Sequence, residues 1–387
     1  MVQTERSRPP IRRLWCAVLF GYLAFGGTLQ ALTRWVPDQL GGGPIETGVA
    51  VGAAFAATAI ARPFAGRAGD AGLARAAVIA SGLLVASGAL GQLVAPNLLV
   101  MVIARLVMGL GEAALFSAAL PWVLHGLAPE RRASVAGWFG LSMWGGLALG
   151  PLVVTAGGLL LDPEQVWWVI IGFGLVAAAF AATTPAGGMD RRGRLRPEHW
   201  REVLPRGAAL PGVVFGLGAY GYGTIASGLV LFLDRSQLGG SGVALAVFAG
   251  AFLIARAVGS PVVDRWGGPR TTIVTSAVVA CGFVLLALAA SITVALAGAA
   301  VVGGGLSLAL PATVLTTLTR TGGAGAGNAV ATATSFWDLG ILVAGPLSGL
   351  IAAGAGFSAM FAAAAACAVV ALVLSVALRS ASAQVVR

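Results

Sequence analysis

The chain has 387 residues, of which 58% are hydrophobic and only 10% are charged. An ordinary soluble domain carries about 25% charged residues, so this chain has too little polar surface to cover a water-soluble fold. The composition therefore excludes a soluble enzyme, a disordered chain and a nucleic-acid-binding module. It predicts a protein whose solvent is mostly lipid.

The positive charge is spread along the chain and forms no patch. All 24 basic residues are arginines, against 14 acidic residues, and the formal net charge is +10. The arginines punctuate apolar stretches, which argues against a nucleic-acid surface. The three cysteines are scattered through apolar stretches and the two histidines fall near predicted loops, with no metal or disulfide spacing. We therefore expect no metal, no cofactor and no enzymatic activity.

Apolar runs of about 20 residues, the length that crosses a bilayer, follow one another along almost the whole chain. The break between the ninth and tenth runs is the least marked, since only Ala290-Ser291-Ile292 defines it. The sequence predicts an all-α membrane protein with twelve transmembrane helices in two six-helix bundles. The predicted helices are 14–35, 45–66, 73–94, 97–121, 132–156, 165–185, 208–232, 242–262, 270–290, 292–318, 325–350 and 354–378.

Polar segments divide the chain into five parts. These are an N-terminal tail (1–13), a first bundle (14–185), an Arg-rich linker (186–207), a second bundle (208–378) and a C-terminal tail (379–387). If the N-terminus is cytoplasmic, 21 of the 24 arginines lie on the cytoplasmic side, as the positive-inside rule requires. We therefore predict a bacterial inner-membrane protein with both termini in the cytoplasm.

The two halves repeat short patterns at a nearly constant offset. Ile60-Ala61-Arg62 returns as Ile254-Ala255-Arg256, an offset of 194 residues. Gly150-Pro151 returns as Gly345-Pro346, an offset of 195 residues. A parallel repeat of six helices is typical of transporters that bind substrate near mid-membrane between the two halves.

Four patterns, in the expected order, resemble those of the major facilitator superfamily. The family's loop pattern G-x-L-x-D-R-x-G-R is similar to Gly259–Arg270, with a degraded copy at 66–72. The fourth helix carries R-x-x-x-G-x-G from Arg105, and the fifth carries G-x8-G-x3-G-P from Gly137 to Pro151. The last pattern resembles the antiporter motif of drug–proton exchangers. The chain as a whole resembles the small bacterial drug- and sugar-efflux-like branch.

The resemblance implies a secondary transporter that works by alternating access. It favours proton-coupled export, or antiport, of a small organic or amphipathic molecule. An uptake symporter for a small organic anion is the alternative, and a non-transporting membrane protein such as a sensor is a third. The Gly-rich stretches lack a P-loop, so the energy source is expected to be an ion gradient. The expected partners of this monomer are a small-molecule substrate, protons and membrane lipid, with no nucleic acid.

Charged residues within predicted helices are candidates for ion coupling, because a charge at mid-bilayer costs about 2.5–3.5 kcal/mol. Arg105 and Glu112 share one face of the fourth helix, about 10 Å apart along its axis. Asp338 lies midway along the eleventh helix. We predict Glu112 and Asp338 as proton sites and Arg105 as a movable counter-charge. The alternatives are a fixed structural ion pair, and a carboxyl group bonded to nearby hydroxyls.

Two further groups of candidates follow from residue type and position. Aromatic rings with few polar groups suit an amphipathic substrate, and charged helix ends and Gly or Pro within helices suit gating. Packing or anchoring in the membrane is the alternative for each residue. The substrate-binding candidates are Tyr22, Gln30, Arg34, Trp144, Tyr220, Tyr222 and Trp337. The gating candidates are Arg62, Asp70, Arg256, Asp264 and Arg265, expected to form inter-helix ion pairs, with Gly146, Gly150, Pro151, Gly345 and Pro346.

Overall fold

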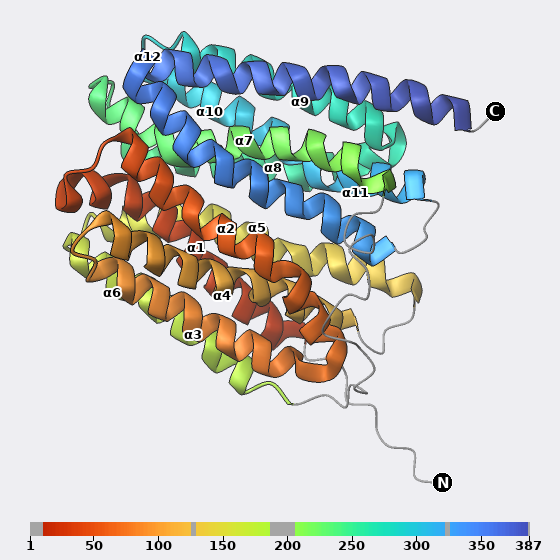
Figure 1. Ribbon diagram of the computed structural model, residues 1–387, viewed down its shortest axis with the longest axis horizontal. Helices are drawn as coiled ribbons and strands as arrows, with labels where there is room; N and C mark the ends of the chain where they lie inside the picture. Colours follow the sequence, from red (N-terminus) through yellow and green to blue (C-terminus); the bar gives the residue numbers. More distant parts are fainter. Residues whose placement is uncertain (1–10, 125–128, 186–205, 322–325, 386–387) are drawn as a thin grey trace.

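Long helices run side by side along almost the whole length of the molecule (Figure 1). The structure is a computed structural model and describes residues 11–124, 129–185, 206–321 and 326–385. Residues 186–205 of the predicted linker, most of the predicted N-terminal tail and the last two residues of the predicted C-terminal tail lie outside these residues. The first half contains α1 (Ile11–Leu40), α2 (Pro44–Ala68), the π-helix η1 (Gly69–Leu73), α3 (Ala74–Leu93), α4 (Leu98–Leu124), α5 (Pro129–Gly157) and α6 (Pro163–Ala182). The second half contains α7 (Arg206–Arg235), α8 (Ser241–Trp266), α9 (Gly268–Ala287), α10 (Ile292–Leu306), α11 (Ala309–Thr321) and α12 (Ala326–Val385).

The described helices contain twelve membrane crossings. Eleven stretches are long and apolar enough to cross a membrane, and the last of them, Thr332–Arg379, has 48 residues. Gly356 breaks this stretch with φ 85° and ψ 169°, a backbone conformation that glycine adopts without steric cost. The eleventh and twelfth crossings therefore meet at Gly356, and the predicted twelve-helix all-α fold is confirmed.

The tenth predicted helix, 292–318, is interrupted in the structure. It begins where Ser291 accepts a hydrogen bond from the Val294 amide, at 3.4 Å, and it divides between Leu306 and Ala309 into α10 and α11. Pro311 has no amide hydrogen to donate to the carbonyl of Ser307, four residues earlier. The interruption frees that carbonyl for another donor.

The two halves form two groups of helices that lie one above the other in Figure 1, with equivalent neighbours in each. In the first half α1 packs on α5 and α6, and α3 packs on α4 and α6. In the second half α7 packs on α12, and α9 packs on α10 and α12. We call the end where α1 begins and α12 ends the terminal face. The end that carries the α1–α2 and α7–α8 connections, on the left in Figure 1, is the distal face.

A crossing of α2 and α12 joins the halves near the distal face. A Cβ atom on Gly48 would lie 2.0 Å from the carbonyl oxygen of Gly345, and one on Gly345 would lie 2.1 Å from that of Gly48. One turn along, a Cβ on Gly349 would lie 2.3 Å from the carbonyl oxygen of Pro44. The helices approach this closely because glycines face each other there.

Two hydrogen bonds also cross between the halves at the distal face. Arg34 of α1 donates to the Ser241 hydroxyl of α8 over 3.1 Å. Thr155 of α5 donates to the carbonyl of Gly242 over 2.7 Å. These bonds and the α2–α12 crossing must separate before the space between the halves can open at this face.

The paired glycines of α5 pack against a different neighbour from those of α12. A Cβ on Gly146 would lie 2.5 Å from the carbonyl oxygen of Leu19, and one on Gly150 would lie 2.4 Å from the amide nitrogen of Gly27. Both contacts are with α1, within the first half. The sequence predicts close helix packing at both places, but the Gly345 crossing lies between the halves and the Gly146 crossing does not.

Candidate functional site

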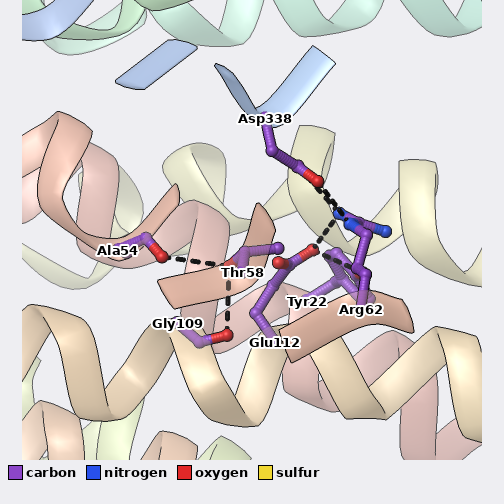
Figure 2. A network of polar contacts seen from close by, with 7 residues as sticks. All are labelled: Tyr22, Ala54, Thr58, Arg62, Gly109, Glu112 and Asp338. Carbon is purple, nitrogen blue, oxygen red and sulfur yellow. Dashed lines mark hydrogen bonds and ion pairs between the residues drawn. The ribbon is translucent and has the colours of Figure 1, made fainter. Parts of the chain in front are cut away.

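One arginine bridges two buried carboxylates that come from opposite halves (Figure 2). Arg62 donates from Nε to Asp338 Oδ2 over 2.6 Å and from Nη2 to Asp338 Oδ1 over 3.0 Å. The same Nη2 donates to Glu112 Oε1 over 3.0 Å. The Tyr22 hydroxyl also donates to Glu112 Oε1, over 2.6 Å. Asp338 is fully buried and Glu112 is 3% exposed, so this cluster lies away from bulk solvent.

Four helices supply the cluster, and each does so from its interior. Tyr22 comes from α1, Arg62 from α2 and Glu112 from α4, all in the first half. Asp338 comes from α12 in the second half. The two parallel bonds from Arg62 to Asp338 are the strong, orientation-specific kind of charged hydrogen bond. The Arg62–Asp338 pair is therefore an ion pair that links the two halves at this depth.

The helices that carry Arg62 and Glu112 are fastened to each other. The Thr58 hydroxyl of α2 lies 3.0 Å from the carbonyl oxygens of both Ala54 and Gly109 (Figure 2). A Cβ on Gly109 would lie 2.0 Å from the Ala54 carbonyl oxygen, so glycine is needed for this approach. Because α2 and α4 are in backbone contact here, Arg62 and Glu112 belong to one rigid unit.

Arg105, predicted as a movable counter-charge, contacts the backbone of α2 in this structure. This fully buried side chain donates from Nε to the carbonyl of Ala50 over 2.8 Å and from Nη2 to the carbonyl of Val51 over 3.1 Å. Its guanidinium also lies 5.2 Å from the centre of the Phe25 ring. Ala50 and Val51 lie next to the α2–α12 crossing. The cation bonded to Glu112 is thus Arg62, and Arg105 braces the backbone of α2, a target that helical spacing within α4 does not reveal.

We expect Arg105→Met to lower the free energy of unfolding by about 2–3 kcal/mol, because a charged donor contributes about 1.5–3 kcal/mol per hydrogen bond. Arg105→Lys should lower the free energy of unfolding by less, since an ammonium group can keep one of the two hydrogen bonds to carbonyls. The measurement is unfolding of the purified protein in detergent. If Arg105 acts only as a brace, its effect should add to that of Glu112→Gln within about 0.5 kcal/mol. A larger departure from additivity would support the predicted role of Arg105 as a counter-charge to Glu112.

A cavity lies between the halves beside the charged cluster, with about 510 Å³ of space free of protein atoms when the part open to solvent is included. Tyr22, Arg62 and Glu112 form its polar wall, and Trp144, Tyr222 and Trp337 are among its aromatic residues. Four of the seven predicted substrate-binding residues therefore line it. The side chains of both halves face this space, as a transporter of the predicted kind requires.

The other three substrate-binding candidates lie elsewhere. Gln30 is buried in α1 and is not among the lining residues of this cavity. Arg34 contacts the second half at the distal face. Tyr220 lies 3.5 Å from the Ser348 hydroxyl inside the second half. These positions indicate packing or contact between the halves, with no direct access to the 510 Å³ cavity.

The structure describes the side chains of three of the five charged gating candidates. Arg62, expected at a helix end with Asp70, instead reaches the central carboxylates. Arg256 donates to the Ser307 carbonyl over 2.9 Å, the carbonyl that Pro311 leaves free. Arg265 is exposed at the end of α8. The side chains of Asp70 and Asp264 lie outside the described residues, so the ion pairs expected of them remain a prediction.

Pro151 and Pro346 lie inside their helices, α5 and α12. Pro346 packs at the α2–α12 crossing, where its Cδ would lie 3.3 Å from a Cβ on Gly52. Pro151 lines a second, apolar cavity between the halves. Both prolines thus lie beside surfaces that the two halves share.

The comparisons with known proteins agree with this architecture. The sequence model described as Major Facilitator Superfamily matches residues 14–321. An uncharacterized MFS-type transporter of Burkholderia pseudomallei is 31% identical over 365 residues, covering 92% of this chain and 88% of that protein. One from Pseudomonas aeruginosa is 33% identical over 350 residues, covering 88% and 86%. A mutant of the nucleoside transporter NupG has the same fold, with a TM-score of 0.76 at 12% identity over 95% of this chain and 99% of that one.

The chain therefore belongs to the major facilitator superfamily. It is a multi-pass membrane protein and a secondary transporter of a small molecule, and the superfamily consists of transport proteins, not enzymes.

Proposed function

We propose that this protein exports a small organic or amphipathic molecule in exchange for protons. The observation that carries the proposal is the sharing of Arg62 between Glu112 and Asp338. One guanidinium faces two carboxylates, so the cluster has an excess of acid groups at a depth where an unpaired charge is costly. A proton on either carboxylate reduces that excess.

Protonation has different consequences at the two carboxylates. A proton on Asp338 weakens the link between the halves, whereas Arg62 and Glu112 stay together because α2 and α4 are fastened at Thr58 and Gly109. Loss of the Arg62–Asp338 pair then favours separation of the halves. Proton binding is in this way converted into a change of access.

The sign of the substrate's charge decides between antiport and symport in such a cluster. A cation, or a group rich in hydrogen-bond donors, competes with protons for the same carboxylates, so each expels the other. An anion would instead be favoured when protons free Arg62, which is symport. The excess of carboxylates and the antiporter-like pattern from Gly137 to Pro151 support antiport. Uptake of an organic anion is the alternative.

The proposed orientation places the terminal face in the cytoplasm of a bacterial cell. The arginine distribution along the sequence supports this orientation, and the relatives from Burkholderia and Pseudomonas support a bacterial inner membrane. The contacts at the distal face would then close the outer side of the transporter. We propose that the protein works as a monomer.

The proposal is tested by proton movement in everted membrane vesicles. A panel of organic cations, neutral aromatics and organic anions is first screened for stabilisation of the purified protein. Compounds that stabilise it are then added to vesicles with an acidic interior. An exporting antiporter moves compound in and protons out, so the interior should become less acidic. A symporter would instead accumulate compound in right-side-out vesicles.

Glu112→Gln and Asp338→Asn should each reduce this proton movement at least tenfold, about 1.4 kcal/mol of lost coupling. Glu164→Gln, the same chemical change at an exposed position in α6, is the matched control and should behave as wild type. Proton movement that survives both central substitutions would contradict the proposal.

A further inference from the structure

The internal repeat places Trp144 within one residue of the position equivalent to Asp338 in the other half. Trp144 and Asp338 are 194 residues apart, and the repeat offset is 194 between Arg62 and Arg256 and 195 between Gly150-Pro151 and Gly345-Pro346. Arg62 reaches from α2 across to Asp338 on α12. Arg256 reaches from α8 across to Trp144 on α5, with its guanidinium carbon 5.7 Å from the ring centre. In each half an arginine thus contacts the opposite half at neighbouring positions of the repeat. The contacted side chain is a carboxylate in one case and an indole in the other.

Aromatic side chains of the second half surround Trp144. Its ring stacks on Phe252 with centroids 4.9 Å apart, and it meets Trp337 edge-on at 5.9 Å. Both neighbours belong to the second half, so the indole lies on the boundary between the halves. Aromatic surfaces in these arrangements bind flat apolar groups well.

Trp144 also separates two cavities. It lines the 510 Å³ cavity beside Glu112 and a second cavity of about 440 Å³ toward the distal face. Leu147 and Tyr222 line both as well. The walls of the second cavity are otherwise apolar, with Leu245 and Phe248 among them. A molecule that extends from one cavity into the other therefore meets the indole of Trp144, together with Leu147 and Tyr222.

The indole nitrogen of Trp144 has no hydrogen-bond acceptor among the residues that the structure describes. The side chain is only 6% exposed, and a buried donor without an acceptor is unfavourable. A molecule in the adjoining cavities that offers an acceptor can remove this penalty. An apolar molecule of the same shape cannot.

We propose that Trp144 is a specificity-determining residue that binds a flat aromatic substrate through ring contact and through a hydrogen bond from Nε1 to an acceptor on the edge of that substrate. The two tasks thereby fall on neighbouring positions of the repeat, with proton exchange at Asp338 and substrate recognition at Trp144. This inference rests on the proposed transport function, whose substrate class it narrows.

The test uses quinoline and naphthalene, two flat probes of the same shape that differ by one acceptor nitrogen. Their affinities for the purified protein are measured by equilibrium dialysis at neutral pH, with protein-free detergent micelles as the reference. Wild type should prefer quinoline over naphthalene by about three- to tenfold relative to Trp144→Phe, the gain expected of one hydrogen bond. Trp144→Phe keeps an aromatic ring and removes the donor. Trp144→Ala should weaken both probes.

Trp168→Phe is the matched control, because Trp168 is 58% exposed on α6 and its loss should leave the preference at the wild-type value. An unchanged preference in Trp144→Phe would overturn the proposal, and so would the absence of binding of either probe to wild type. Circular dichroism and gel filtration establish that each variant is folded. Because no proton gradient is present, failure here leaves proton coupling at Glu112 and Asp338 intact, whereas failure of the vesicle experiment leaves this binding preference intact.

Discussion

The Arg62→Gln variant will be less stable than the wild-type protein by about 3–5 kcal/mol, the cost of leaving a buried ion pair without one partner. Asp338 is fully buried and Glu112 is 3% exposed. In the variant, both carboxylates would lack the cation that they share. The free energy of unfolding is measured on purified protein in detergent. The loss should exceed that of any single carboxylate substitution in the cluster.

Adding Asp338→Asn to Arg62→Gln should restore part of that stability, because it removes one of the uncompensated charges. The non-additivity between the two substitutions should be about 0.5–3 kcal/mol. Asp38→Asn is the matched control, since Asp38 is exposed at the end of α1. Additive effects of Arg62→Gln and Asp338→Asn would mean that the inter-half ion pair contributes nothing to stability.

The Gly345→Ala variant should lose transport at least tenfold, about 1.4 kcal/mol, while remaining folded. The added Cβ would lie 2.1 Å from the Gly48 carbonyl oxygen, so α2 and α12 must move apart. Overpacking of this kind costs about 1–3 kcal/mol. That cost applies only when the distal face is closed. The equilibrium between the closed and open states of this face should therefore shift toward the open state.

The shift is measured by the distance between spin labels attached to cysteines at Asp38 and Gln237, two exposed positions near the distal face. The distance should lengthen in Gly345→Ala. Gly354→Ala lies further along the same helix, where a Cβ meets nothing within 4 Å, and should leave the distance and the transport rate unchanged. A Gly345→Ala variant with wild-type distances and transport would show that the crossing is not part of gating.

Hydropathy alone was sufficient to predict the fold class. Each crossing must satisfy its own backbone hydrogen bonds in lipid, so the number of crossings is a property of local sequence. Hydropathy does not predict the interruption of the tenth helix at Ser307, because Pro311 lies within a continuous apolar run. The absence of an amide hydrogen at Pro311 is the sequence signal that predicts this interruption.

The central cluster was only half predicted. Glu112 and Asp338 stood out because buried charges are rare in membrane helices. The sequence predicts Arg62 at a helix end because it follows a long apolar run, and nothing in the sequence tells how far its side chain reaches inward. Helical spacing pairs Arg105 with Glu112, but in the structure Arg105 donates to carbonyls of α2, and backbone acceptors have no sequence signature.

The sequence by itself determined that the chain lies in a membrane, crosses it twelve times, repeats after six helices and buries a few ionisable groups. Tertiary structure alone decided which of those groups meet. Arg62 lies 50 residues from Glu112 and 276 residues from Asp338 along the chain. Such pairings depend on how the helices pack, and the packing depends on close contacts such as Gly48 on Gly345, whose partners cannot be read from either helix alone.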